Sequence, residues 1–269
     1  SAHSANAQSI ADFATAAESE LRRLGLVPRI TDPDHLALIH WGSATAKLGL
    51  GQLDDAEHHA LRHEAIAARL TPHHEVHAIG NLVTLDEAAG RWDRLHERTE
   101  WSERAVAENA DTPCVYNPRN LLACAVACAA LGLDDEARRL EAEESALGFE
   151  GYDFWLDPLR ARLALIRGDL DRVEALLDAS EKWNWQVYNF VNAVATRLDA
   201  LVAVGRADEA AEDAERYARP GTYLEPFALR TLGIARGDSA LVAQAQKRFE
   251  AMGLEWYAAQ TPVLVANAR

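Results

Sequence analysis

Histidine is the residue type whose placement most suggests chemistry, because all ten histidines lie within the first 96 residues. His59 and His63, and likewise His73 and His77, are four residues apart, so in a helix each pair faces one side and has the spacing of a metal-binding pair. The stretch "HHEVH" differs from the H-E-x-x-H zinc motif, whose second histidine would stand where the chain has Ala78. We therefore expect solvated or capping histidines and no metal site, with added positive charge in this region near pH 6.

Cysteine usage indicates a reducing compartment. The chain has three cysteines, of which Cys124 and Cys128 are four apart in an apolar stretch. No histidine lies near them in sequence to complete a zinc set. We expect buried thiols and a cytoplasmic protein.

Signatures of catalysis are not found in the sequence. It contains neither a G-x-S-x-G elbow nor a G-x-x-x-x-G-K-[ST] phosphate loop. Carboxylate pairs such as Asp54/Asp55 and Glu143/Glu144 fall at expected helix starts and on polar faces, where solvation explains them. We predict that the protein is not an enzyme and uses no cofactor.

Charge and hydropathy exclude two classes of partner. The formal net charge is −15, whereas nucleic-acid binding requires clustered lysine and arginine, and anionic lipid surfaces repel an acidic protein. The longest apolar run, Leu121–Leu133, has 13 residues and is shorter than the roughly 18–20 that span a bilayer. We expect a soluble protein that binds neither nucleic acid nor membrane.

A recurring hexapeptide defines the elements that must position these residues. It begins with glycine at positions 51, 90, 132, 168, 205 and 237, which are 32 to 42 residues apart, and a small or aliphatic residue follows five places later. Helix starts are marked by Asp32–Pro33, Thr71–Pro72, Asn117–Pro118 and Asp157–Pro158. Two helices per unit at this period predict an all-α fold, an α-solenoid of about six helical hairpins.

The repeated unit resembles the tetratricopeptide repeat (TPR), whose unit of about 34 residues has a turn glycine and a small residue at this offset. The resemblance covers residues 32–254 as six helix pairs, in a single domain spanning 1–269. Residues 1–26 are expected to form a half-repeat or cap helix, and 255–269 a C-terminal cap helix.

A finer resemblance is carried by "LRRLGL", "ARLALIRGDLDRVEALL" and "AQKRFEAMGLEWYAAQT". These stretches are similar to degenerate TPR arrays of large bacterial regulators that also carry an ATPase module, and often a cyclase or a LuxR-type DNA-binding domain. This resemblance implies a docking or sensory segment of a signalling or transcriptional regulator. We expect a domain of a larger protein, with a complete small protein as the alternative.

In proteins of this family the first helix of each pair lines a concave groove, which implies a set of binding residues here. Polar side chains at helical spacing and one tryptophan make up the expected groove: Trp41, His77, Asn81, Thr84, Arg119, Asn120, Arg162, Asn189, Asn192, Thr196 and Asp199. Amides and guanidinium groups suit a peptide backbone or a carboxylate. The alternative is a plain solvated face with tryptophans that pack between repeats. The aromatic segment 181–189, "EKWNWQVYN", either fills a gap between units or edges a pocket.

Two functions follow from this groove. The first is a protein-interaction module that docks a peptide or protein partner, which predicts an open superhelix with a solvent-filled polar concave face. The alternative is a small-molecule sensor, which predicts an enclosed, aromatic-lined pocket. Apolar faces at the two ends of the array also suggest self-association.

Overall fold

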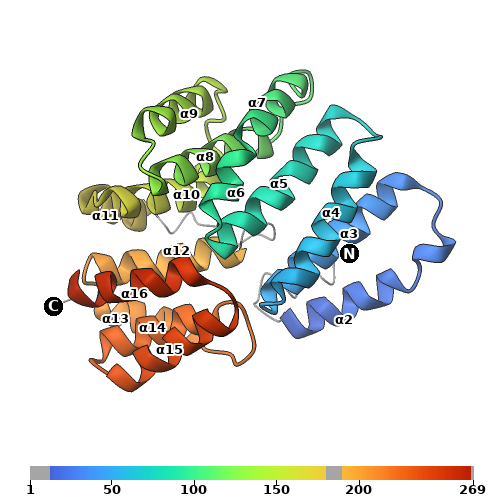
Figure 1. The fold of residues 1–269 in the computed structure, drawn as a ribbon. Helices are drawn as coiled ribbons and strands as arrows, with labels where there is room; N and C mark the ends of the chain where they lie inside the picture. The colour runs from blue at the N-terminus through green and yellow to red at the C-terminus, as the bar shows by residue number, and fades with distance from the viewer. Residues whose placement is uncertain (1–12, 180–189, 268–269) are drawn as a thin grey trace.

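The computed structural model describes residues 13–179 and 190–267, and within these ranges it confirms the all-α prediction. Fifteen α-helices and one short 3-10 helix make up the described chain, which contains no β-strand (Figure 1). In none of the described helices do length and apolarity reach what a membrane span requires.

Turns and loops join the described helices in chain order. Those of the first half are α2 (Phe13–Leu24), η1 (Val27–Arg29), α3 (Pro33–Gly49), α4 (Leu53–Ala67), α5 (Pro72–Ala89), α6 (Trp92–Glu97), α7 (Thr99–Glu108) and α8 (Tyr116–Ala130). Those of the second half are α9 (Asp134–Ala146), α10 (Asp153–Arg167), α11 (Leu170–Asp178), α12 (Phe190–Ala203), α13 (Ala207–Tyr217), α14 (Glu225–Ala235), α15 (Ser239–Ala251) and α16 (Glu255–Asn267).

The six repeated glycines end the first helix of a pair, as predicted. All six have φ between +64° and +77°, a left-handed conformation that glycine adopts without steric penalty. After each glycine, the next N–H donates to a carbonyl five residues back, as in Gln52 to Lys47 and Arg91 to Asp86. This bond closes a Schellman motif, so each glycine both stops a helix and turns the chain.

Two of the predicted helix starts are wrong. α8 begins at Tyr116, and the Asn117 amide oxygen accepts bonds from Cys114 N–H and Asn109 Nδ2, so this side chain ties the preceding loop. α10 begins at Asp153, so Pro158 lies inside the helix. The extra turn places Leu156 in the core, and the proline removes only one hydrogen bond of the helix.

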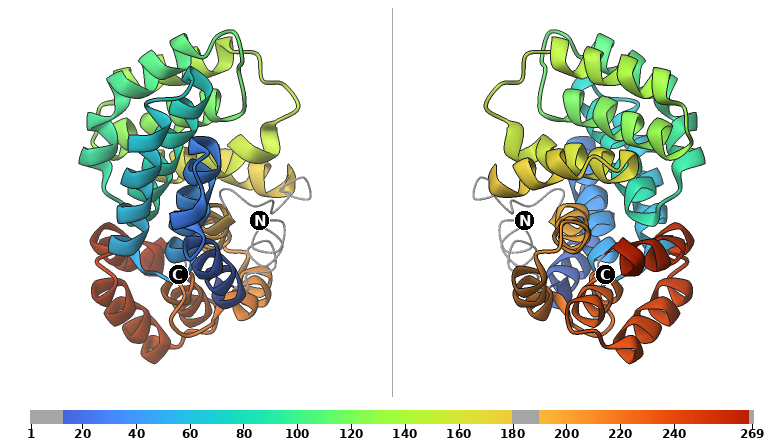
Figure 2. Two further views of the ribbon diagram at one scale, coloured as in Figure 1. Left: turned by 90° about the vertical axis from the view of Figure 1, so that its right-hand side faces the viewer. Right: turned by 90° about the vertical axis from the view of Figure 1, so that its left-hand side faces the viewer.

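The C-terminal helices pack against the first third of the chain. The Tyr223 hydroxyl donates to Ala88 O at 2.7 Å, and the Tyr257 hydroxyl donates to Glu87 O at 2.9 Å. Tyr223 N–H also donates to Gly49 O at 3.0 Å. In Figures 1 and 2, α13–α16 form the lower part of the molecule, and α12 lies between α5 and α16, both of which it contacts.

Helices from the first third and from the last third of the chain share one core. One cluster of buried side chains joins Leu82 and Leu85 of α5 to Leu198 of α12 and to Phe227 and Phe249 of α14 and α15. A second cluster joins α5, α6, α7, α8, α9 and α10. In a linear repeat protein, stability comes from each repeat and from its contacts with adjacent repeats. Here contacts between helices far apart in sequence also contribute to stability.

Two of the turn glycines face the C-terminal helices directly. A Cβ atom at Gly90 would lie 2.9 Å from Trp256 Cβ, and one at Gly51 would lie 3.1 Å from Met252 Cε. Around Gly168, no atom lies within 4 Å of such a Cβ. Gly51 and Gly90 thus serve both the turn and the contact between distant helices.

The Gly90 contact predicts unequal effects of alanine at two turns of the same geometry. Gly168→Ala should lower the free energy of unfolding by about 1–2 kcal/mol through backbone strain. Gly90→Ala should lose a further 1–3 kcal/mol or so, because the new methyl group overlaps Trp256. Urea unfolding followed by circular dichroism measures both, and equal losses would contradict the close approach.

Candidate functional site

The structure places most of the predicted groove residues inside the protein. Asn189 lies outside the described residues. Trp41 and His77 are half-buried, and the other eight are buried: Asn81, Thr84, Arg119, Asn120, Arg162, Asn192, Thr196 and Asp199. Both predictions for these eight residues are wrong, because both the solvent-filled groove and the plain solvated face require side chains that are exposed to water.

Buried amides among them connect helices to one another. Asn192 Nδ2 donates to Thr84 O at 3.1 Å, which joins α12 to α5. Asn120 Nδ2 donates to Val76 O at 3.1 Å, which joins α8 to α5. The amide groups proposed to bind a peptide backbone thus bind the backbone of the protein itself.

The charged members lie in two buried groups: Arg119 pairs with Glu87, and Arg162, Asp199 and Arg230 form an ion network. Arg162 Nη1 lies 2.8 Å from Asp199 Oδ2, Arg230 contacts the other Asp199 oxygen, and Arg119 Nη2 lies 2.8 Å from Glu87 Oε2. Arg230 also donates to Tyr257 O at 2.9 Å. This network holds two guanidinium groups and one carboxylate, so Asp199 shares its charge between two arginines.

Sequence reasoning missed Arg230 as a member of this network. It stands in the α14 stretch "EPFALRTLGIA", where it is the only basic residue. A single basic residue inside a largely apolar helix is the signal that could have identified a buried ion pair. Burial lowers the pKa of the Arg230 guanidinium, and the negative charge of Asp199 opposes this effect.

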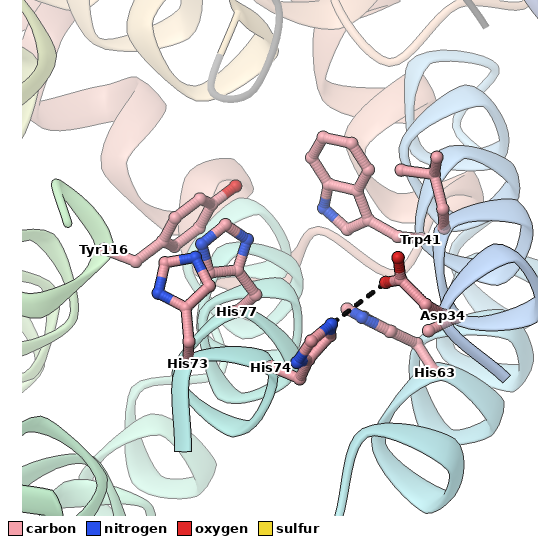
Figure 3. A pocket seen from close by; sticks show the side chains of 9 residues that line it. Asp34, Trp41, His63, His73, His74, His77 and Tyr116 are labelled. Carbon is pink, nitrogen blue, oxygen red and sulfur yellow. Dashed lines mark hydrogen bonds and ion pairs between the residues drawn. The ribbon is translucent and has the colours of Figure 1, made fainter. Parts of the chain in front are cut away.

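Trp41 and His77 meet in a pocket between α3, α4, α5 and α8, which we call the histidine pocket. Its volume is about 310 Å³, and it is lined by Asp34, Ala37, Leu38, Trp41, His63, His73, His74, His77 and Tyr116. Figure 3 shows Trp41 and Asp34 on one side, His73, His77 and Tyr116 on the other, and His63 and His74 below them. Polar and aromatic groups from four helices therefore converge on one space.

Hydrogen bonds and ring contacts hold these side chains in place. His74 Nε2 lies 2.9 Å from Asp34 Oδ1, which joins α5 to α3 (Figure 3). The rings of His77 and Tyr116 have centroids 4.5 Å apart. The sequence identified Trp41 and His77, but it gave no signal that Asp34 and Tyr116 would join them, since this depends on how the hairpins pack.

Burial keeps the innermost imidazoles neutral. Desolvation, together with nearby histidines, lowers the pKa of His63 to about 3 and the pKa of His77 to about 4. His40, outside the pocket, is lowered to about 4 by the same causes together with the nearby Arg62. The expectation that the cluster gains positive charge near pH 6 is therefore wrong for these three. A neutral imidazole offers one donor and one acceptor to a ligand.

One chain of contacts at the pocket edge resembles a nucleophile–base–acid relay. Thr71 Oγ1 lies 2.8 Å from His74 Nδ1, and His74 Nε2 contacts Asp34. Thr71 is the N-cap residue of α5, however, and both Thr71 and Asp34 are exposed to water. Since a relay of this kind functions in a water-excluded site, we interpret these contacts as the fixing of a helix start.

Two larger hollows lie elsewhere on the described surface. One of about 500 Å³ lies between α14, α15 and α16, and its lining has no charged residue. Another of about 740 Å³ is lined by α8, α10, α12 and α16 and includes Arg162 and Asp199. These two charges pair with each other, so the histidine pocket is the stronger candidate for ligand recognition.

The ion network predicts a large effect of one nearly isosteric change. Asp199→Asn should lower the free energy of unfolding by about 3–5 kcal/mol, because Arg162 and Arg230 remain buried without a carboxylate. Glu212→Gln, which removes an exposed partner of Arg216, should cost less than about 1 kcal/mol. Urea unfolding compares the two, and losses of similar size would contradict the role given to Asp199.

The depressed pKa of His63 predicts a pH-dependent stability. In the unfolded chain the His63 imidazole is protonated below its ordinary pKa of 6.5, whereas in the folded protein it stays neutral down to about pH 3. The free energy of unfolding therefore falls as the pH falls from about 6.5 to about 3. For His63→Gln, the slope of unfolding free energy between about pH 5 and pH 6 should be smaller by about 1 kcal/mol per pH unit. His58→Gln removes an exposed imidazole from the same helix and serves as the control. An unchanged slope in His63→Gln would show that this imidazole titrates normally.

Comparisons of the chain with protein-family models, with curated proteins and with solved structures give no match. The functional interpretation therefore depends on the geometry of the histidine pocket.

Proposed function

We propose that this protein is a recognition module that binds a small ligand in the histidine pocket. The observation that supports this proposal is the convergence of Trp41, Tyr116 and four histidines on a space of about 310 Å³. Pockets for small molecules are mostly apolar concavities of this order of size with a few fixed polar groups. The module is proposed to bind its ligand without catalytic turnover.

The chemistry of the lining specifies the ligand class. The indole of Trp41 and the phenol of Tyr116 offer flat apolar surfaces that suit an aromatic ring. Neutral imidazoles at His63 and His77 suit hydroxyl, amine or carbonyl substituents, which both donate and accept hydrogen bonds. A small aromatic compound with such polar substituents therefore fits the site better than a purely aliphatic one.

A peptide or protein partner is the second candidate. Leu38 lines the pocket, yet 45% of its surface is exposed. A peptide that inserts an aromatic side chain would cover this leucine, whereas a small ring would leave it in water. The ligand chemistry inside the pocket is the same in both cases.

The wider setting is also proposed. Consecutive helices that pair around left-handed glycines support a TPR-like solenoid, here with its two ends in contact. A TPR-like array suits the sensory or docking region of a bacterial signalling or transcriptional regulator. Free thiols at Cys114, Cys124 and Cys128 support a cytoplasmic location.

A screen of aromatic fragments by ligand-observed NMR tests the proposal, with phenols, aromatic amines and aromatic carboxylates as probes. For the best fragment, Trp41→Ala should weaken binding at least tenfold, or about 1.4 kcal/mol. Tyr152→Ala, which removes an exposed aromatic side chain outside the pocket, should leave the affinity unchanged.

The same probes separate the possible outcomes. A fragment carried on a short peptide that binds tighter than the free fragment, with the gain lost in Leu38→Ala, would favour the peptide partner. Fragments that bind wild type and Trp41→Ala equally would overturn the proposed site.

A further inference from the structure

We infer that His73, His77 and Cys114 form a binding site for a zinc ion at the wall of the histidine pocket. One donor atom from each of these residues lies within 4.8 Å of the other two. His73 and His77 come from the first two turns of α5, and Cys114 comes from the loop before α8. From sequence we expected no metal site, because no histidine stands near a cysteine; the fold brings together residues about 40 positions apart.

The distance between two of these donors fits tetrahedral zinc. Cys114 Sγ lies 3.4 Å from His77 Nε2. With Zn–S near 2.3 Å and Zn–N near 2.0 Å, a tetrahedral ion separates sulfur and nitrogen ligands by about 3.5 Å. The two side chains therefore already stand at the spacing of neighbouring ligands.

Contacts outside the ligand set orient the donors. His73 Nδ1 lies 3.1 Å from Thr112 O, and since a carbonyl only accepts, this nitrogen carries the proton and Nε2 keeps its lone pair. The backbone N–H of Cys114 donates to Asn117 Oδ1 at 3.1 Å, which fixes the loop that carries the thiol. Histidine ligands in metal sites are commonly held by such a bond to a backbone carbonyl.

The pocket supplies the remaining coordination position. Three protein ligands leave one position of a tetrahedral ion open, as in sites that bind water or a ligand on zinc. His73 and His77 line the pocket, whereas Cys114 does not. All three are half-buried, so each is partly accessible to solvent.

The donor set selects the kind of metal. Two imidazoles and one thiolate are ligands of zinc and of softer transition metals, whereas magnesium and calcium prefer oxygen. Binding replaces the thiol proton of Cys114 by the metal and releases that proton to solvent. The chain holds another group with similar donors, His96, Cys128 and Glu136, in which Cys128 is fully buried and His96 already contacts Glu136.

Titration of the full chain with Co²⁺, a spectroscopic substitute for Zn²⁺, tests the site. One equivalent should produce a thiolate-to-cobalt charge-transfer absorption, and Zn²⁺ should displace it. Cys114→Ser should abolish this absorption, and His73→Gln should weaken Zn²⁺ binding more than tenfold by calorimetry. Circular dichroism checks that both variants keep the helical content of the wild type.

The control variants make each outcome decisive. Cys128→Ala should keep the absorption; its loss in this variant but not in Cys114→Ser would place the metal at the other group and overturn the inference. Absence of any cobalt–thiolate absorption would overturn it as well. The Trp41→Ala variant should still bind the metal ion but should no longer bind aromatic fragments. The experiments can therefore reject the metal site and the proposed ligand function separately.

Discussion

Asp199 is the side chain on which the arrangement of the helices most depends. Its two oxygens contact Arg162 of α10 and Arg230 of α14, and all three residues are almost completely buried. A buried charge is tolerated only when it is paired, so α10, α12 and α14 must meet at this point. The Arg230 bond to Tyr257 O extends the constraint to α16, and the Tyr257 bond to Glu87 O extends it to α5.

This constraint changes what the first helices of the pairs do. In an open array their polar residues would face a groove, but here eight of the predicted groove residues are buried, and of these Arg162 and Asp199 also line the hollow of about 740 Å³. Asn120 and Asn192 accordingly satisfy backbone carbonyls of α5. Gly90 completes the fit, because a Cβ atom there would lie 2.9 Å from Trp256 Cβ, and at Gly51 a Cβ atom would require the Met252 side chain to shift. Polar residues at helical spacing can therefore serve internal packing as well as recognition.

The proposed recognition site lies between α3, α4, α5 and α8. The histidine pocket combines flat aromatic surfaces with imidazoles that burial keeps neutral, and the same wall carries a thiol. Neutral imidazoles serve an organic ligand and a metal ion equally well, because both use the lone pair that a proton would otherwise occupy. A ligand in the pocket and an ion at Cys114 would thus share His77.

The sequence by itself determined the local structure: the all-α class, the six glycine turns and the start of α3 at Asp32–Pro33, where the Asp32 carboxylate accepts a bond from Asp34 N–H. These features depend on residues within one or two turns of each other. It also named Trp41 and His77 as candidate groove residues, and both line the histidine pocket. Tertiary structure alone decided that Asp199 and Arg162 are buried, that Arg230 joins them, and that Asp34, Tyr116 and Cys114 reach the histidines. The physical reason is that helical periodicity shows which residues share a face, whereas the burial of that face depends on which distant helix packs against it.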